Sequence, residues 1–342
     1  MNTRGPRPAY ECRPVGETAR ALYDEALVWD MTLPWVEGYA DEDITLPRFR
    51  AAGVDLISLT VNDFPGSVGG TVRQIAKVKA TVAARAEDLV LITSADDVRR
   101  AKAAGKLALT LNLQETNPLE RSLEMVQVFY DLGVRHMLLA YNQKNYVGDG
   151  CAEATDAGLS RFGRRAVQEM NRVGMLVDGT HSGYRTTMEA IEISERPFIF
   201  SHCCARGVAP HYRNIKDDQI KACAATGGVI GINGVGGFLI DKQAHTGSMF
   251  RHVDHVVQLV GARHVGIGLD YVKDPAAFWV TARNAPEAWP QIDGKPHEDH
   301  ETVQPEQLLE LTDLMLGAGY AEDDVRGILG ENFLRVAEAV WK

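Results

Sequence analysis

Three residues of types that bind metal ions each follow a short apolar run of the sequence. They are Glu115, His181 and His202. Zinc and similar divalent ions are held by imidazole nitrogens and carboxylate oxygens, and a catalytic site keeps one coordination position open for water. A metal ion bound in this way lowers the pKa of its water ligand and makes it a nucleophile. If the fold brings these three residues together, the sequence predicts a metal-assisted hydrolytic site.

Two further residues extend this chemistry. Asp270 closes the apolar segment 265–268, and Arg213 follows His202 by eleven positions. A carboxylate at Asp270 could bind the metal or take the proton from metal-bound water, or it could simply cap the next loop. The planar guanidinium of Arg213 suits a substrate carboxylate, and the alternative is a surface ion pair.

Eight short apolar runs separated by helix-like stretches must position these side chains. Strand followed by helix, eight times over, is the pattern of a (β/α)8 TIM barrel, whose chemistry gathers at the C-terminal ends of its strands. We therefore expect the polar residues that end the runs to meet at one barrel mouth. These residues are Asp30, Asn62, Glu115, Tyr141, His181, His202, Asn233 and Asp270.

The connecting segments support a single domain over residues 1–342 with a short N-terminal extension. Apolar spacing and a following glycine predict helices over 119–132 and 162–173, and 186–193 and 217–225 also have helical patterns. Residues 273–303 show no clear period, so we expect a long irregular loop over the barrel mouth. Residues 305–342 are expected to form two or more helices.

The amino-acid composition limits the classes of partner that the chain is expected to bind. The net charge of −10, with dispersed Lys and Arg, argues against nucleic acid, and no run of 18 apolar residues predicts a membrane span. The polar N-terminus lacks the apolar core of a signal peptide, so a cytoplasmic location is expected. Five cysteines without a C-x-x-C pair are expected to be reduced thiols. Among them Cys151, in a glycine-rich and acidic loop, is also a minor site candidate.

Several segments in order resemble the renal (membrane) dipeptidase family, from about Leu27 to the C-terminus. They are residues 131–135, 169–175, 178–181, 201–202, 213–214, 266–270 and 329–336, together with Glu115. The resemblance implies a barrel of the metallo-dependent hydrolase type that cleaves dipeptides, tolerates a D-residue at the C-terminal position and uses two zinc ions bridged by a glutamate.

The resemblance also implies roles for individual residues. Glu115 would be the bridging ligand, and His181 and His202 would complete one zinc site. Asp270 would be the acid/base carboxylate, and Arg213 would bind the carboxylate of the dipeptide. A homodimer is the habit of this family.

The sequence departs from the family pattern at two strand ends. The family has His-x-Asp before a Leu-Pro pair, whereas this chain has Asp30 and Thr32 there. Because the threonine hydroxyl is neutral and a poor zinc ligand, we expect one or two zinc ions, with Asp30 as an additional ligand. The histidine that steadies the oxyanion in the family is replaced by Tyr141, whose phenol can donate a similar hydrogen bond.

The sequence thus predicts a metal-dependent hydrolase of dipeptides or related small amides that carry a carboxylate. Asp270 and Tyr141 are expected to be catalytic, and Arg213, Tyr141 and Asn233 to bind the substrate. One alternative is a mononuclear metalloenzyme acting on a non-peptide amide or lactam, or catalysing a non-hydrolytic conversion. Another is a non-catalytic binding protein. Two acidic residues near Cys151 could shape their loop or add site contacts; they are Glu153 and Asp156.

Overall fold

The computed structural model describes residues 10–35, 40–62, 65–291 and 297–342. Its parallel strands run in the order β2-β1-β9-β8-β7-β6-β5-β4-β3, and an additional pairing of β2 with β4 closes the ring. Eight strands therefore form a closed barrel, and β3 lies outside it against the first half of β4. The strands are β1 (Trp29–Pro34), β2 (Leu56–Thr60), β3 (Leu89–Leu91), β4 (Leu107–Leu113), β5 (Val134–Leu138), β6 (Leu176–Asp178), β7 (Ile199–Cys203), β8 (Val229–Asn233) and β9 (Val265–Gly268).

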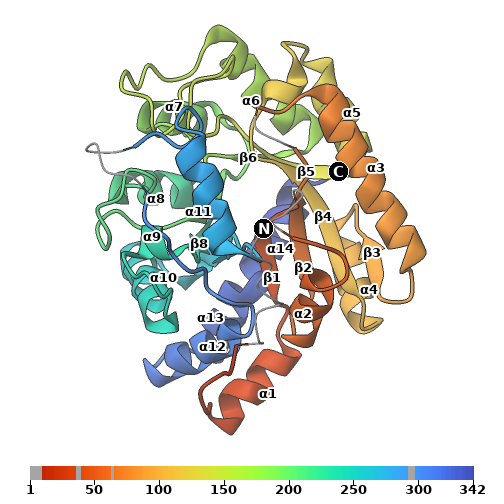
Figure 1. The fold of residues 1–342 in the computed structure, drawn as a ribbon, viewed down its shortest axis with the longest axis vertical. Helices are drawn as coiled ribbons and strands as arrows, with labels where there is room; N and C mark the ends of the chain where they lie inside the picture. Colours follow the sequence, from red (N-terminus) through yellow and green to blue (C-terminus); the bar gives the residue numbers. More distant parts are fainter. Residues whose placement is uncertain (1–9, 36–39, 63–64, 292–296) are drawn as a thin grey trace.

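Helices surround the barrel (Figure 1), so the predicted (β/α)8 fold is confirmed. They are α1 (Glu17–Glu25), α2 (Thr45–Ala51), α3 (Val68–Ala84), α4 (Ala95–Ala103), α5 (Glu124–Asp131), α6 (Arg161–Val173), α7 (Tyr184–Ile193), α8 (Asp217–Ala225), α9 (Gly236–Leu239), α10 (Thr246–Val260), α11 (Pro275–Asn284), α12 (Gln307–Gly317), α13 (Glu322–Arg326) and α14 (Asn332–Val340), with short turns η1 (Asn117–Leu119), η2 (Ala262–His264) and η3 (Gly327–Glu331).

Helix α6 shows why the sequence pattern was informative. The Ser160 hydroxyl accepts a hydrogen bond from the Gly163 amide at 2.9 Å and so caps the first turn. Its apolar stripe includes Val167 and Met170, which are fully buried. The helix ends at Gly174, whose φ of 97° is a left-handed conformation that glycine adopts without strain.

Three elements differ from the sequence predictions. The helix expected over 119–132 begins only at Glu124, because the residues before it form η1 and then Glu120 and Arg121 take positive φ values of 46° and 61°. Strand β3 was not predicted, since three residues are too few to show a period. The segment 273–303 was expected to be irregular, which is wrong for α11: Asp274 caps this helix by accepting from the Ala277 amide at 3.1 Å, and Pro275 starts it.

The two ends of the barrel interior differ in chemistry. Phe333 of α14 packs against Trp29 of β1, with ring centroids 6.1 Å apart, and an apolar cluster closes the N-terminal end. Above that cluster the interior is polar: Ser58, Asn112 and His136 are at most 1% exposed. Bulky branched apolar residues usually fill this position in TIM barrels. The buried polar layer lies beneath the mouth and is available to orient groups there.

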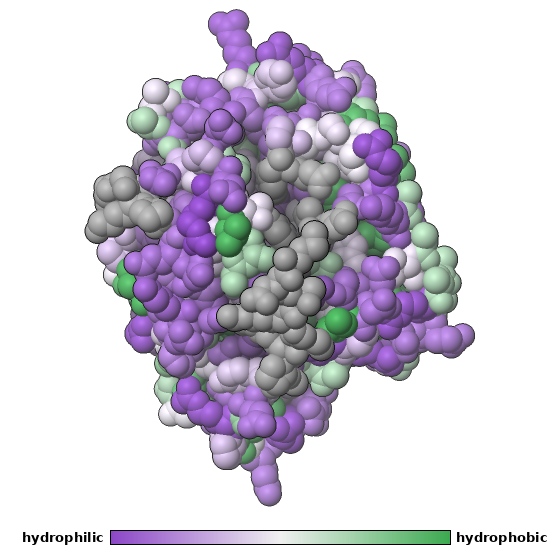
Figure 2. All heavy atoms as spheres, in the orientation of Figure 1, coloured by the Kyte–Doolittle hydropathy of each residue, from purple (hydrophilic) through white to green (hydrophobic). Residues whose placement is uncertain are grey.

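The outer surface is largely hydrophilic on the face shown in Figure 2. The large apolar side chains that the described residues expose are scattered over several elements, as single residues normally are. None of the described helices is both long enough and apolar enough to span a membrane.

Candidate active site at the barrel mouth

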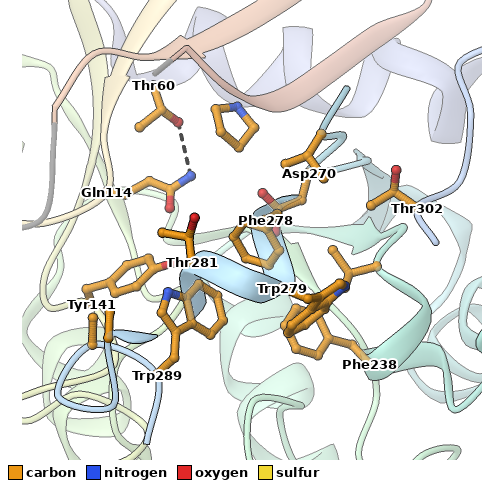
Figure 3. A pocket seen from close by; sticks show the side chains of 15 residues that line it. Thr60, Gln114, Tyr141, Phe238, Asp270, Phe278, Trp279, Thr281, Trp289 and Thr302 are labelled. Atoms are coloured by element: carbon orange, nitrogen blue, oxygen red, sulfur yellow. Dashed lines mark hydrogen bonds between the residues drawn. The ribbon is translucent and has the colours of Figure 1, made fainter. Parts of the chain in front are cut away.

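A cavity of about 250 Å³ opens at the C-terminal ends of the strands. Figure 3 shows polar side chains on one side of it and a group of aromatic rings on the other. The rings come mainly from α11 and the residues after it. The lining residues are Pro34, Thr60, Gln114, Tyr141, Val235, Phe238, Asp270, Val272, Phe278, Trp279, Thr281, Ala285, Ala288, Trp289 and Thr302.

Asp270 is the ionisable carboxyl group in this lining. Its backbone has a φ of 54°, which is uncommon for a residue with a side chain and is often found at functional sites. The side-chain amide of Asn233 donates to Asp270 Oδ2 at 3.2 Å. Burial raises the pKa of Asp270, opposed by the charge of Arg213 and by the Asn233 hydrogen bond. A carboxyl group with a raised pKa is suited to exchanging protons near neutral pH.

Tyr141 forms one wall of the cavity through its ring contacts. It stacks on His181 with ring centroids 3.9 Å apart and meets Trp289 edge-on at 5.6 Å. Trp289 in turn packs edge-on against Phe278 at 5.3 Å. These aromatic contacts are favourable geometries, and they place the phenol of Tyr141 beside the space that a ligand would occupy.

His181 and His202 lie behind this wall with ring centroids 5.2 Å apart. Nδ1 of His181 lies 2.7 Å from Asn142 Oδ1, and Nδ1 of His202 lies 3.0 Å from the hydroxyl oxygen of Thr32. Nε2 of His202 is buried without a hydrogen-bond partner among the described residues. Burial first, and then the nearby Arg213 charge, lowers the pKa of both imidazoles well below its usual value, so both are neutral.

Glu115 does not line the mouth cavity. Its Oε1 accepts from the Gly66 amide and its Oε2 from the Asn117 side chain at 2.6 Å, and burial raises its pKa to about 7. Side chains of a strand alternate between its two faces. Asn112 of β4 and Gln114 just after it point into the barrel, whereas Glu115 lies on the bend that follows the strand, beside Gly66 and Asn117.

Asp30 of β1 lies inside the barrel next to β9. Its Oδ1 accepts from the Leu269 amide at 2.8 Å and from the Thr32 amide at 3.2 Å, whereas its buried Oδ2 has no partner among the described residues. Burial raises its pKa to about 7, and the neighbouring charge of Asp270 adds to this effect.

The donor set predicted for zinc does not fit a metal centre in this arrangement. Within the described ranges no group of three or more His, Cys, Asp and Glu side chains is placed to hold a metal ion. The Glu115 carboxylate accepts hydrogen bonds from Gly66 and Asn117, and the hydroxyl of Thr32 donates to its neighbour's carbonyl. We therefore derive no reaction step through a metal.

Arg213 faces a second cavity of about 190 Å³ rather than the mouth. Its guanidinium donates to the His202 carbonyl oxygen at 2.9 Å and to Cys203 Sγ at 3.2 Å, and its Nε lies 3.1 Å from His181 Nδ1. The Arg213 charge still acts on Asp270 of the mouth, and a contact of Arg213 with a substrate carboxylate stays a prediction.

The loop after the fourth predicted strand lines that second cavity. Burial raises the pKa of the Cys151 thiol to about 12, which keeps it protonated and unreactive. Glu153 and Asp156 accept hydrogen bonds from the backbone amides of Lys144 and Arg185, at 2.6 and 2.9 Å. These contacts favour the loop-structure interpretation of the two acids.

A family model described as membrane dipeptidase (Peptidase family M19) matches residues 37–285. The chain belongs to this family. An uncharacterized dipeptidase of Schizosaccharomyces pombe is 32% identical over 212 residues, 60% of this chain and 51% of that protein. Dipeptidase tcpJ of Claviceps purpurea is 29% identical over 82% of this chain and 63% of its own length. The matches thus span between half and two thirds of these two relatives.

Solved structures agree with the barrel. An amidohydrolase from Pseudomonas aeruginosa superposes with a TM-score of 0.84 at 29% identity, covering 94% of this chain and 99% of that chain. A metallo peptidase from Rhodobacter sphaeroides, solved with a phosphinate mimic of L-Ala-D-Ala, has a TM-score of 0.76 at 19% identity, covering 92% and 99%. At that identity the second match shows the shared fold alone.

The structure brings Asp270, Tyr141 and Asn233 together at the mouth, as expected for a membrane dipeptidase. Glu115 and Arg213 are not among the residues that line this cavity. The sequence interpretation missed Gln114, which lines the cavity and donates to Thr60. The period-two alternation along residues 107–114 was the available signal, because it places Gln114 on the inner face. The aromatic lining from α11 had no comparable signal.

Proposed function

We propose that this chain hydrolyses the amide bond of a small, dipeptide-sized molecule held in the mouth cavity. The observation that carries the proposal is Asp270, a buried carboxyl at the C-terminal end of the barrel, fixed by Asn233 beneath an aromatic-lined space. Active sites of TIM-barrel enzymes lie at this end. Membership of a peptidase family supports amide hydrolysis as the reaction class.

Asp270 would act as general base and then as general acid. It takes a proton from water as the water oxygen bonds to the amide carbon, and it returns that proton to the nitrogen when the carbon–nitrogen bond breaks. The Tyr141 phenol would donate a hydrogen bond to the oxyanion of the tetrahedral intermediate. Asn233 holds the carboxyl of Asp270 in position. Zinc-activated water is not part of this proposal, since the candidate ligands do not form a metal-holding group.

The test is a hydrolysis screen of L,L- and L,D-dipeptides, dipeptide amides and N-acyl amino acid amides, read by mass spectrometry. The Asp270→Asn variant keeps the volume of the side chain and removes the base, so turnover should fall roughly 100-fold or more. The matched control is Asp88→Asn, at an exposed surface ion pair with Arg50, which should keep wild-type turnover.

Equal turnover in Asp270→Asn and wild type would remove Asp270 from the mechanism. If several probes bind and none is hydrolysed, the proposal is wrong and the alternative of a non-catalytic binding protein takes its place.

A further inference from the structure

Three aromatic side chains from α11 and the residues after it form one side of the mouth cavity. They are Phe278, Trp279 and Trp289, and we call them the aromatic panel. Phe278 meets Trp279 edge-on with ring centroids 4.8 Å apart and meets Trp289 edge-on at 5.3 Å. Trp289 also meets Tyr141 edge-on at 5.6 Å. Edge-to-face contacts are favourable geometries for aromatic rings, so each ring of the panel restricts the orientation of the next.

Two hydrogen bonds fix the backbone around the panel. The indole N–H of Trp279 donates to the carbonyl oxygen of His300 at 2.9 Å. The side-chain amide of Asn142, on the loop after β5, donates to the carbonyl oxygen of Ala288 at 2.9 Å and so holds the residue next to Trp289. A site whose side chains already hold their positions loses less conformational entropy when a ligand binds. The panel is therefore preorganised for a ligand.

The three rings differ in how far other side chains cover them. Trp279 is 3% exposed, as a core residue is. Phe278 and Trp289 are half-buried, and both line the cavity. Apolar ring surface that faces a cavity is stabilised when the apolar atoms of a ligand displace water from it. Phe278 and Trp289 therefore offer a binding surface, whereas Trp279 belongs to the core that supports them.

The polar side of the cavity carries the proposed chemistry. Asp270 and Gln114 belong to this side (Figure 3), so a substrate with its amide at Asp270 extends a neighbouring group towards the panel. The cavity of about 250 Å³ is several times the roughly 30 Å³ that one water molecule occupies, which leaves room for such a group. A glycine or alanine residue would leave the rings facing water, because it has at most one methyl group to place against them.

We propose that the mouth selects substrates with a bulky apolar side chain, aromatic or branched, next to the scissile amide, and that Phe278 is a specificity-determining residue. The side chain would pack against the rings of Phe278 and Trp289 while the amide lies at Asp270. Dipeptides built only from glycine and alanine would be poor substrates, because they leave this surface uncovered. The proposal names the substrate class of the proposed function and, for turnover, rests on it.

The test compares three dipeptides with identical charged ends, L-Ala-L-Ala, L-Phe-L-Ala and L-Ala-L-Phe. Mass spectrometry of the released amino acids gives kcat/KM for the wild type, and isothermal titration calorimetry with the Asp270→Asn variant gives dissociation constants. At least one phenylalanine dipeptide should exceed L-Ala-L-Ala roughly tenfold in kcat/KM and in affinity, a difference of about 1.4 kcal/mol. Equal values for all three, a preference for L-Ala-L-Ala, or neither binding nor turnover of the phenylalanine dipeptides would overturn the proposal.

Two variants test the role of Phe278. Phe278→Ala removes the ring and should lower the preference for the phenylalanine dipeptide about three- to tenfold, chiefly by raising its KM. Phe278→Tyr keeps the ring and should keep the preference. The matched control is Phe250→Ala on α10, because Phe250 is also half-buried but packs against Tyr320, with ring centroids 6.2 Å apart, and does not line the cavity. This control should keep the wild-type preference. An unchanged preference in a Phe278→Ala protein that thermal unfolding shows to be folded would overturn the assignment.

The two measurements separate this inference from the proposed function. Tighter binding of a phenylalanine dipeptide without hydrolysis of any dipeptide would support the bulky apolar ligand class and remove the hydrolase. Hydrolysis of all three dipeptides with equal kcat/KM would leave the hydrolase standing and overturn the inference.

Discussion

Replacing Asp30 by Asn should stabilise the protein at alkaline pH, in spite of its position beside the proposed site. The Asp30 carboxyl is fully buried, and its Oδ2 has no partner among the described residues. Burial raises its pKa from 3.8 to about 7, so ionising it in the folded chain is disfavoured relative to the unfolded chain by about 4 kcal/mol. The amide removes that cost but buries an NH₂ group without a partner, at about 1–3 kcal/mol.

The sign of the pH dependence follows from proton binding. Between the ordinary pKa of an aspartate and about 7, the folded state holds the proton and the unfolded state has lost it, so wild-type stability falls as pH rises through this window. The net gain of Asp30→Asn is therefore expected to be about 1–3 kcal/mol at about pH 8. It should shrink by about 2–3 kcal/mol by about pH 5, where wild-type Asp30 is protonated in the folded state.

Urea unfolding of both proteins at these two pH values measures the difference in the free energy of unfolding. Asp88→Asn, at an exposed position, should show no comparable change with pH. A large loss of stability in Asp30→Asn at about pH 8, reversed by added zinc in the wild type alone, would refute the reasoning. It would show that Asp30 is an ionised metal ligand.

Three further outcomes are expected. Asp270→Gly should raise the free energy of unfolding by about 1 kcal/mol, because glycine relieves the strain of a φ of 54°, and it should abolish turnover. Thermal unfolding measures the stability and the hydrolysis screen measures the turnover. A variant less stable than wild type would contradict the strain argument. Elemental analysis should find zinc well below one ion per chain, and chelation should leave turnover unchanged, because no group of three or more His, Cys, Asp and Glu side chains among the described residues is placed to hold a metal; stoichiometric zinc whose removal abolishes turnover would be the opposite result. Asp178→Asn should cost about 1–3 kcal/mol in urea unfolding, since it weakens a buried hydrogen bond with His136 Nδ1, and no measurable cost would mean that this hydrogen bond is not formed.

The sequence by itself determined the barrel, the family and part of the site. Apolar runs of strand length alternating with helical stripes allow few folds, and a polar residue after such a run must lie near the barrel mouth. Asp270, Tyr141 and Asn233 lie there for this reason. The same local rule, followed one step further along 107–114, places Gln114 inside.

Only the tertiary structure decided what else faces the cavity. Arg213 lies on a loop, whose side-chain direction is set by what packs around it, and its donors bond to β7 rather than to the mouth. The aromatic lining depends on how α11 packs over the barrel, which no local period records. The hydrogen bonds that lead to Gln114 join residues from β2, β4, β5 and β6. Such contacts between distant parts of the chain exist only once the barrel has closed.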